Sequence, residues 1–276
     1  MVSGDTSVVG QIAWPLTGRP AVVITGASSG IGRALVEIAA GEGHEVVLIA
    51  RDPSPLALLA ASLETAAHTV PLDLRRSDAV AEIGAVLSAH GLRCEILVNN
   101  AGVGLTGRMD ELPAADQLDL VALNVRAPMA LALAALPSMR AHGTGGVLNI
   151  GSIAGSFPGP NMGAYFASKA FIRSFSEALW TEMRGVGVNV SCLVCGPVNT
   201  AFFDRSGSST TRLSRILPRV PADRVARQAW EGLRRGQRII VPDLCSRMLL
   251  LLMAAVPRGP ALRLLRRLQS GGGSQA

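Results

Sequence analysis

One tyrosine and one lysine, four residues apart, are the side chains in this sequence best suited to acid–base chemistry. Tyr165 is the only tyrosine among 276 residues, and Lys169 is the only lysine. On a helix, residues i and i+4 project from the same face, one turn apart. A phenol can donate a proton and take it back, and a nearby positive charge lowers its pKa of about 10 by favouring the phenolate. The pair therefore predicts a proton-transfer site in which Lys169 lowers the pKa of Tyr165.

The composition makes a chance pairing the weaker interpretation. Every other member of the 26 lysines and arginines is an arginine. A guanidinium effectively never loses its proton, whereas an ammonium is a compact, titratable charge. The alternative is an exposed lysine and a core tyrosine that happen to lie four apart. We favour the chemical interpretation because neither Phe nor Arg could take over proton transfer.

Short apolar strands alternate with amphipathic helices around this pair. Strands are expected at residues 21–25, 45–50, 69–72, 95–98, 146–150, 188–194 and 238–241. Helices are expected after residue 30 and at 77–90, 113–142, 163–184 and 221–235. Such alternation predicts a parallel sheet with right-handed crossovers. The predicted fold class is α/β, a Rossmann-type doubly wound parallel sheet of about seven strands with helices on both faces.

A glycine-rich turn follows the first expected strand. Residues 26–32 read Gly-Ala-Ser-Ser-Gly-Ile-Gly, and a helical pattern begins at Ile31. Glycines let the backbone approach a pyrophosphate, and a helix N-terminus offers N–H groups and the positive end of its dipole. A lone glycine pattern is a weak signal, but one between a strand and a helix predicts a dinucleotide site.

Charged residues after the second and third strands bear on which dinucleotide is bound. An acidic residue after the second strand would hold a ribose 2′-hydroxyl, whereas an arginine suits a 2′-phosphate. Arg51 stands there, followed by Asp52, so we predict NADP(H), with a solvated arginine as the alternative. Asp73 ends the third strand, where its carboxylate can accept a hydrogen bond from the adenine amino group.

Further polar residues end the remaining strands. Ligands of parallel α/β sheets bind beyond the carboxyl ends of the strands. Six features fall at such ends: the glycine-rich turn, Arg51, Asp73, Asn99, Ser152 and the segment 195–197. Their convergence predicts a single site at this edge of the sheet.

Together these residues resemble the classical short-chain dehydrogenase/reductase family over about residues 20–242. The family usually carries Pro-Gly after the sixth strand, where this chain has Cys-Gly-Pro at 195–197. Segments 159–162 and 174–179 look like the branch that reduces bulky ketones and oxoacyl groups. The matching motifs are Thr25-Gly26-x3-Gly30-x-Gly32, Asn99-Asn100-Ala101-Gly102, Asn124, Ser152 and Tyr165-x3-Lys169.

The resemblance implies a role for each of these residues. Tyr165 would exchange a proton with the substrate oxygen, while Lys169 would hold the nicotinamide ribose and lower the pKa of Tyr165. Ser152 would hydrogen-bond the substrate oxygen, and Asn124 would hold a water that links Lys169 to solvent. The implied cofactor-binding residues are Gly26, Ser28, Ser29, Gly30, Ile31, Gly32, Arg51, Asp73, Leu74, Asn100, Ala101, Gly102, Tyr165, Lys169, Gly196, Val198 and Thr200.

We therefore predict an NADP(H)-dependent oxidoreductase that interconverts a hydrophobic ketone and a secondary alcohol. A narrower alternative is a 3-oxoacyl thioester reductase that acts on carrier-protein or CoA substrates. A different class is a non-catalytic NADPH-binding regulator or membrane-docked scaffold, which would need the glycine turn but not Tyr165. We expect a cytoplasmic homodimer or homotetramer, with peripheral membrane contact as an alternative.

The spacing of two cysteines bears on whether the protein binds a metal. Cys192 and Cys195 have C-x-x-C spacing, but strand positions i and i+3 point to opposite faces, so we predict buried thiols and no metal site.

Charge is distributed unevenly along the sequence. Residues 1–204 hold 12 cationic and 17 acidic side chains, a net charge of −5. Residues 205–276 hold 14 arginines and three acids, a net charge of +11. Such a basic end favours an anionic partner. Nothing resembles a nucleic-acid-binding module, and no nucleic acid partner is expected.

The expected domain organisation has three parts. Residues 1–19 read as an arm that lacks the features of a signal peptide. Residues 20–243 form the catalytic domain, in which 199–220 is the expected substrate lid. Residues 244–276 are a basic, apolar extension whose nine-residue run at 248–256 would rise ~13.5 Å, too short to span a bilayer core of ~30 Å. We expect the pocket wall or a second subunit to cover segment 244–267, with an anionic membrane surface as the alternative.

Overall fold

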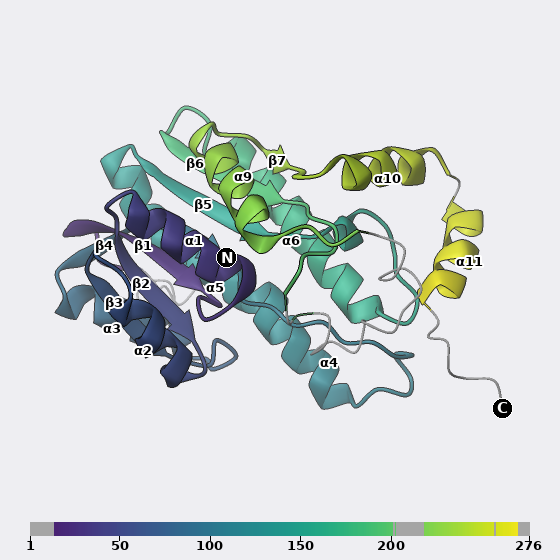
Figure 1. Cartoon of the computed structure of the whole chain (residues 1–276), viewed down its shortest axis with the longest axis horizontal. Coiled ribbons are helices and arrows are strands. Elements are labelled where there is room, and N and C mark those ends of the chain that lie inside the picture. The colour runs from purple at the N-terminus through teal and green to yellow at the C-terminus, as the bar shows by residue number, and fades with distance from the viewer. Residues whose placement is uncertain (1–13, 201, 203–217, 257, 270–276) are drawn as a thin grey trace, which may run out of the picture.

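Seven parallel strands form one sheet at the centre of the protein (Figure 1). The computed structural model describes residues 14–200, 202, 218–256 and 258–269. The strand order is β3-β2-β1-β4-β5-β6-β7, so the chain winds outward on both sides of the β1–β4 pair. This order confirms the predicted Rossmann-type doubly wound α/β sheet. The strands are β1 Arg19–Thr25, β2 Glu45–Ala50, β3 Ala67–Pro71, β4 Leu92–Asn99, β5 Gly145–Ile150, β6 Val188–Leu193 and β7 Ile239–Ile240.

Helices cover both faces of this sheet, as predicted. One face packs against α1 (Gly30–Gly41), α2 (Pro53–Ala61) and α9 (Ala222–Arg234), and its core includes Val22 and Val46. The opposite face packs against α3 (Ala79–Ala89), α5 (Ala127–His142) and α6 (Gly163–Glu182), and its core includes Val23 and Val47. Neighbouring strand residues thus enter different cores because successive side chains alternate between the faces.

The expected helix at 113–142 is continuous but contains a wider turn. It consists of α4 (Ala114–Val121), a π-helical turn η2 (Ala122–Arg126) and α5. The stretch 114–142 is long and apolar enough to cross a membrane, but only by length and composition. Half of its most apolar window is buried within the fold, and α5 packs on β4. These features are typical of a core helix.

The structure contains a helix that was not predicted, and strand β4 begins earlier than expected. Helix α2 was not predicted, because it is apolar on all sides and gives no helical periodicity. Its start is nonetheless encoded, since Pro53 occupies the first turn and the Asp52 carboxylate accepts the Ser54 N–H at 3.1 Å. Strand β4 begins at residue 92, three residues earlier than expected. The charged residue Arg93 interrupts the apolar pattern of the sequence, but in the fold it is buried and pairs with Glu95 at 3.1 Å.

Trp14, at the described end of the N-terminal arm, packs against helices α3 and α5. Its side chain is buried, its Nε1 donates to the Val80 carbonyl at 2.9 Å, and its backbone N–H donates to the Ala134 carbonyl. A Cβ on Gly84 would lie 2.9 Å from Trp14 Cδ1, so the indole uses the space that this glycine leaves. Residues 1–13 of the predicted arm lie outside the described residues, and the predicted domain boundaries stay predictions.

The four cysteines are all free thiols. Cys192 and Cys195 join hydrophobic clusters on opposite sides of β6, in agreement with the alternation expected of a strand. The prediction of buried thiols is confirmed for Cys192 and Cys195, and Cys94 is buried as well, but Cys245 is exposed on a helix.

The chain ends in two helices, α10 (Leu244–Ala255) and α11 (Arg258–Gln269), which extend from β7 at the right of Figure 1. The Asp243 carboxylate caps α10 by accepting the Ser246 N–H at 2.7 Å. Leu249 and Leu250 pack on the cluster around Cys192. One side of the predicted extension is therefore held against the fold.

Candidate active site

The glycine-rich turn between β1 and α1 has the geometry of a dinucleotide cradle. Gly26 and Gly30 have φ values of 63° and 56°, which side chains with a Cβ rarely adopt. A Cβ on Gly30 would lie 2.7 Å from Thr200 Cγ2, and one on Gly32 would lie 2.2 Å from the Gly26 carbonyl oxygen. Only glycine fits at these positions, and the N-terminus of α1 opens into the cleft beside them. The turn therefore fits a pyrophosphate.

Thr25 and Asn100 hold this turn in place. The buried Thr25 Oγ1 accepts the N–H groups of Asn100 and Ala101 at 2.9 and 3.0 Å and donates to the Val98 carbonyl at 3.1 Å. Asn100 Nδ2 donates to the carbonyls of Thr25 and Gly26 at 2.9 and 3.1 Å. The predicted residue Asn100 thus lines the cleft, but its side chain is committed to the backbone of the turn.

The predicted adenosine end of the cleft carries Arg51 and Asp73. Arg51 is exposed and lines the cleft. The Asp73 carboxylate accepts the backbone N–H and the guanidinium of Arg75, which also pairs with Asp119 on α4. Arg75 holds the pKa of the Asp73 carboxyl below its usual value, chiefly through this hydrogen bond. The expected adenine acceptor is thus already engaged by Arg75, a residue that the sequence analysis did not identify.

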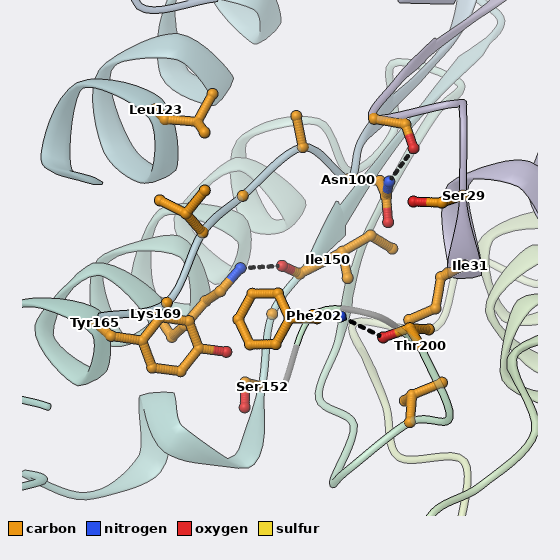
Figure 2. Close-up of a pocket in the computed structure, with 18 of the residues that line it drawn as sticks. Ser29, Ile31, Asn100, Leu123, Ile150, Ser152, Tyr165, Lys169, Thr200 and Phe202 are labelled. Carbon is orange, nitrogen blue, oxygen red and sulfur yellow. Dashed lines mark hydrogen bonds between the residues drawn. The ribbon is translucent and has the colours of Figure 1, made fainter. Parts of the chain in front are cut away.

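Lys169 and Asn124 lie deeper in the fold. Lys169 Nζ donates to the Ile150 carbonyl at 2.8 Å (Figure 2). Asn124, in the π-helical turn, accepts the Val103 N–H at 2.9 Å and donates to the Val103 carbonyl at 2.8 Å and to Ser168 Oγ at 3.1 Å. Ser168 was also missed, although it stands between Tyr165 and Lys169 in the sequence. The predicted water relay through Asn124 stays a prediction.

Tyr165 and Ser152 both line the cleft, and Figure 2 shows their side chains close together with Lys169 nearby. Ser152 Oγ accepts the Ala154 N–H at 3.1 Å, which fixes the serine at the start of the short helix η3 (Ile153–Ser156). Burial raises the pKa of Tyr165, and the nearby Ser152 hydroxyl offsets this only in part. The Tyr165 phenol is therefore protonated at neutral pH, as a proton donor must be.

The expected lowering of the Tyr165 pKa by Lys169 differs from what this structure gives. The Lys169 ammonium lies 5.9 Å from the Tyr165 ring centroid, and its hydrogen bond goes to a backbone carbonyl. Burial, which disfavours charge, lowers the pKa of Lys169 itself. Desolvation is thus the larger effect on both groups. The sequence could show the pairing but not the burial.

The space next to Tyr165 is apolar. Tyr165 packs in a cluster with Leu120, Ala154, Met162 and Phe166, and Phe202 lies beside it with the ring centroids 5.7 Å apart. The whole cleft has a volume of about 710 Å³. Among its described lining residues, the charged ones are Arg51, Asp52, Asp73 and Lys169. The part around Tyr165 is therefore suited to a hydrophobic group next to a polar, reacting one.

Most of the predicted site residues meet in this one cleft. Gly32 and Asn124 do not line the cleft. Gly32 packs closely against the Gly26 carbonyl of the glycine-rich turn, and Asn124 hydrogen-bonds the backbone of the lining residue Val103. Of the expected lid at 199–220, residues 201 and 203–217 lie outside the described residues. No described residue of α10 or α11 lines the cleft. The predicted residues that do line it are Gly26, Ser28, Ser29, Gly30, Ile31, Arg51, Asp73, Leu74, Asn100, Ala101, Gly102, Ser152, Tyr165, Lys169, Gly196, Val198 and Thr200.

The turn at Cys195, where the resemblance departs, is held by contacts with the segment after β5 and with α10. The Cys195 carbonyl accepts the Ile153 N–H at 3.0 Å, and a Cβ on Gly196 would lie 2.5 Å from Ser246 Oγ. Burial raises the pKa of the Cys195 thiol to about 11, so it stays protonated at neutral pH. Val198 pairs with Val220, which brings the two ends of the expected lid together.

Comparison with known proteins identifies relatives of this chain. The profile of the short chain dehydrogenase family matches residues 20–210. A very-long-chain 3-oxoacyl-CoA reductase of Coprinopsis cinerea is 34% identical over 204 residues, which cover 71% of this chain and 58% of that protein. This chain therefore spans little more than half the length of that relative.

Solved structures agree with the family match. A short-chain dehydrogenase from Sphingobium yanoikuyae in complex with NADPH is 32% identical, with a TM-score of 0.74 over 86% of this chain and 96% of the other. A bulky-bulky ketone specific alcohol dehydrogenase from Comamonas testosteroni is 28% identical, with a TM-score of 0.69 over 88% and 96%.

Proposed function

Because the chain belongs to the short chain dehydrogenase family, a family of oxidoreductases that bind a nicotinamide cofactor, we propose that it interconverts a hydrophobic ketone and a secondary alcohol with NADP(H). The observation that carries this proposal is the apolar cluster against Tyr165 and Ser152, the two groups that can hydrogen-bond a carbonyl oxygen. A hydrophobic substituent would fill the cluster while its carbonyl meets these two hydroxyls.

Each polar residue has a defined task in this proposal. Tyr165 donates its proton to the substrate oxygen in reduction and removes it in oxidation. Ser152 hydrogen-bonds the same oxygen where negative charge develops. Lys169, held by the Ile150 carbonyl, would hold the hydroxyls of the nicotinamide ribose, and Asn124 fixes the loop at Val103. The bound nicotinamide supplies or accepts the hydride.

The preference for NADP(H) rests on Arg51. It is exposed after β2, at the place where an acidic residue would hold a 2′-hydroxyl, and a guanidinium can bind a 2′-phosphate. The NADPH complex of the Sphingobium yanoikuyae relative supports the same choice.

A second candidate is the reduction of a 3-oxoacyl thioester. The name of the Coprinopsis cinerea relative and the net charge of +11 in residues 205–276 favour it, because CoA and acyl carriers are anionic. A KM for the thioester that rises with salt, beside a salt-insensitive KM for a small ketone, would support this candidate.

The assembly and location remain predictions. We propose a homodimer or homotetramer, supported by the apolar side chains Leu118, Val121, Met129 and Leu133 exposed along α4 and α5. The cytoplasmic location stays a prediction, and the exposed apolar side of α10 favours its alternative, membrane contact through segment 244–267.

The activity is tested by Tyr165→Phe, which removes the phenolic hydroxyl and keeps the ring in its cluster. We expect nearly complete loss of ketone reduction, with the affinity for NADPH close to that of the wild type, as measured by fluorescence titration. A general acid typically contributes about 10²–10⁴-fold to the rate. Leu58→Phe, on the exposed side of α2, is a control for the handling of a mutant protein. Wild-type turnover by Tyr165→Phe would contradict the mechanism.

A further inference from the structure

The side of α10 that faces away from the fold is a stripe of large apolar side chains. Leu244, Met248, Leu251 and Leu252, here called the outer stripe, are 61–73% exposed. They occupy positions i, i+4, i+7 and i+8, which lie on one face of a helix. A contiguous exposed patch of this kind marks an interaction surface.

The fold fixes the direction in which the outer stripe points. On the opposite side of α10, Leu249 and Leu250 pack against the cluster around Cys192. The buried Ser246 fits against Gly196 in the turn after β6, and Asp243 caps the helix at 2.7 Å. Helix α10 therefore cannot turn its outer stripe inward without losing these contacts.

After the cap residue Asp243, the two terminal helices carry charge of one sign. After Asp243 the sequence contains no acidic residue and five arginines. Arg247, Arg263 and Arg266 are exposed on α10 and α11. Figure 1 shows both helices at the outside of the molecule, beyond β7 and α6. The charged residues of α10 and α11 are all arginines, here called the arginine rim. An apolar stripe on such helices matches a surface that is apolar inside and negatively charged outside.

We propose that α10 and α11 dock on an anionic phospholipid surface, with the outer stripe in the acyl boundary and the arginines at the headgroups. The 12 residues of α10 rise about 18 Å, which suits a helix in the plane of the interface and not a span. A second copy fits less well, because a two-fold contact would place the arginine rim against itself.

The docked surface lies close to the cleft. Helix α10 contacts η3, which begins directly after Ser152, and Ser246 touches the turn that contains Gly196. Docking would therefore hold the cleft near the bilayer surface, where hydrophobic ketones concentrate. The docking itself does not depend on the proposed reaction, so the two can be tested apart.

The experiment is co-sedimentation of the full chain with vesicles. One set contains phosphatidylcholine alone, and the other contains roughly 30 mol% phosphatidylglycerol. We expect binding to the anionic vesicles at least tenfold stronger than to the neutral ones, and a loss of binding between about 0.1 and 1 M salt. Binding to both sets with equal strength, or to neither, would overturn the proposal.

Two double variants with matched controls locate the surface. Arg263→Gln with Arg266→Gln should weaken binding by about fivefold for each arginine, whereas Arg224→Gln with Arg227→Gln on α9 should not. Leu251→Asn with Leu252→Asn should abolish binding and leave NADPH affinity intact, while Leu58→Asn on α2 should bind normally. If a control variant lost as much vesicle binding as its partner variant, the total charge of the protein or its preparation, and not this surface, would govern binding.

Cys245 provides an independent reading because it is the exposed thiol on α10, whereas the other three are buried. An environment-sensitive fluorophore on Cys245 should shift to the blue with anionic vesicles. A shift that appears with protein concentration, without vesicles, and disappears in the Leu251→Asn, Leu252→Asn variant would show a second copy on the stripe and refute the membrane proposal.

Discussion

Thr25 offers a sharp test of how the glycine-rich turn is held. Its Oγ1 is the acceptor for two partly buried backbone N–H groups, those of Asn100 and Ala101. Thr25→Val keeps the shape of the side chain and removes the oxygen. Each unsatisfied buried donor costs about 1–3 kcal/mol, so the variant should lose about 2–6 kcal/mol of unfolding free energy. For a domain of this size the Tm should fall by roughly 4–24 °C.

The assay is thermal unfolding followed by circular dichroism, with Thr25→Ser as the matched control. Serine keeps the oxygen and loses one methyl group, which should cost about 1 kcal/mol. NADPH affinity should fall in Thr25→Val, because the turn is tied to Asn100 through the same residue, and should change little in Thr25→Ser. Equal Tm values for the two variants would show that the N–H groups find other partners, and would refute the reasoning.

Two further predictions concern charge at the adenosine end of the cleft. Arg51→Asp should weaken NADPH binding and move the kcat/KM preference toward NADH, whereas Arg140→Asp on α5 should leave that preference unchanged. Equal kcat/KM values for both cofactors in the native protein would contradict the NADP(H) proposal. Arg75 holds the pKa of Asp73 below its usual value. This pair therefore stabilises the fold above the ordinary aspartate pKa of about 3.9, and the stabilisation is lost as the pH falls through the lower folded value. In Arg75→Gln, the NMR titration of Asp73 should move up toward that ordinary value and acid unfolding should begin at a higher pH; an unchanged Asp73 titration would exclude Arg75 as the cause.

The sequence was sufficient for the sheet and for most of the residues at its edge. Parallel strands have a strong local signature of apolar runs, and their carboxyl ends must meet, so Arg51, Ser152 and Tyr165 could be placed in one cleft. Helix α2 escaped because its apolar residues have no helical period, and its capping by Asp52 is a single weak signal.

What the sequence could not show depends on burial and on partners distant along the chain. The pairing of Arg75 with Asp119 spans 44 residues and joins two elements whose contact only the fold creates. The π-helical turn at Asn124 has no sequence period of its own, and it is this turn that aims the side chain at Val103. The pKa of Tyr165 followed the depth of its burial, which the spacing to Lys169 does not reveal.

The single lysine has a consequence for chemical labelling. Lys169 is 7% exposed, and burial lowers its pKa, so a larger share of this amine is neutral and nucleophilic than in an ordinary lysine. The remaining cationic side chains are arginines, which amine-directed reagents do not modify. Amine-directed reagents small enough to enter the cleft therefore meet one side-chain amine, and it lies at the proposed ribose site. Lys169 can therefore serve as a site for labelling the proposed active site. The degree to which NADPH slows the modification of this amine measures how much of the cleft is occupied.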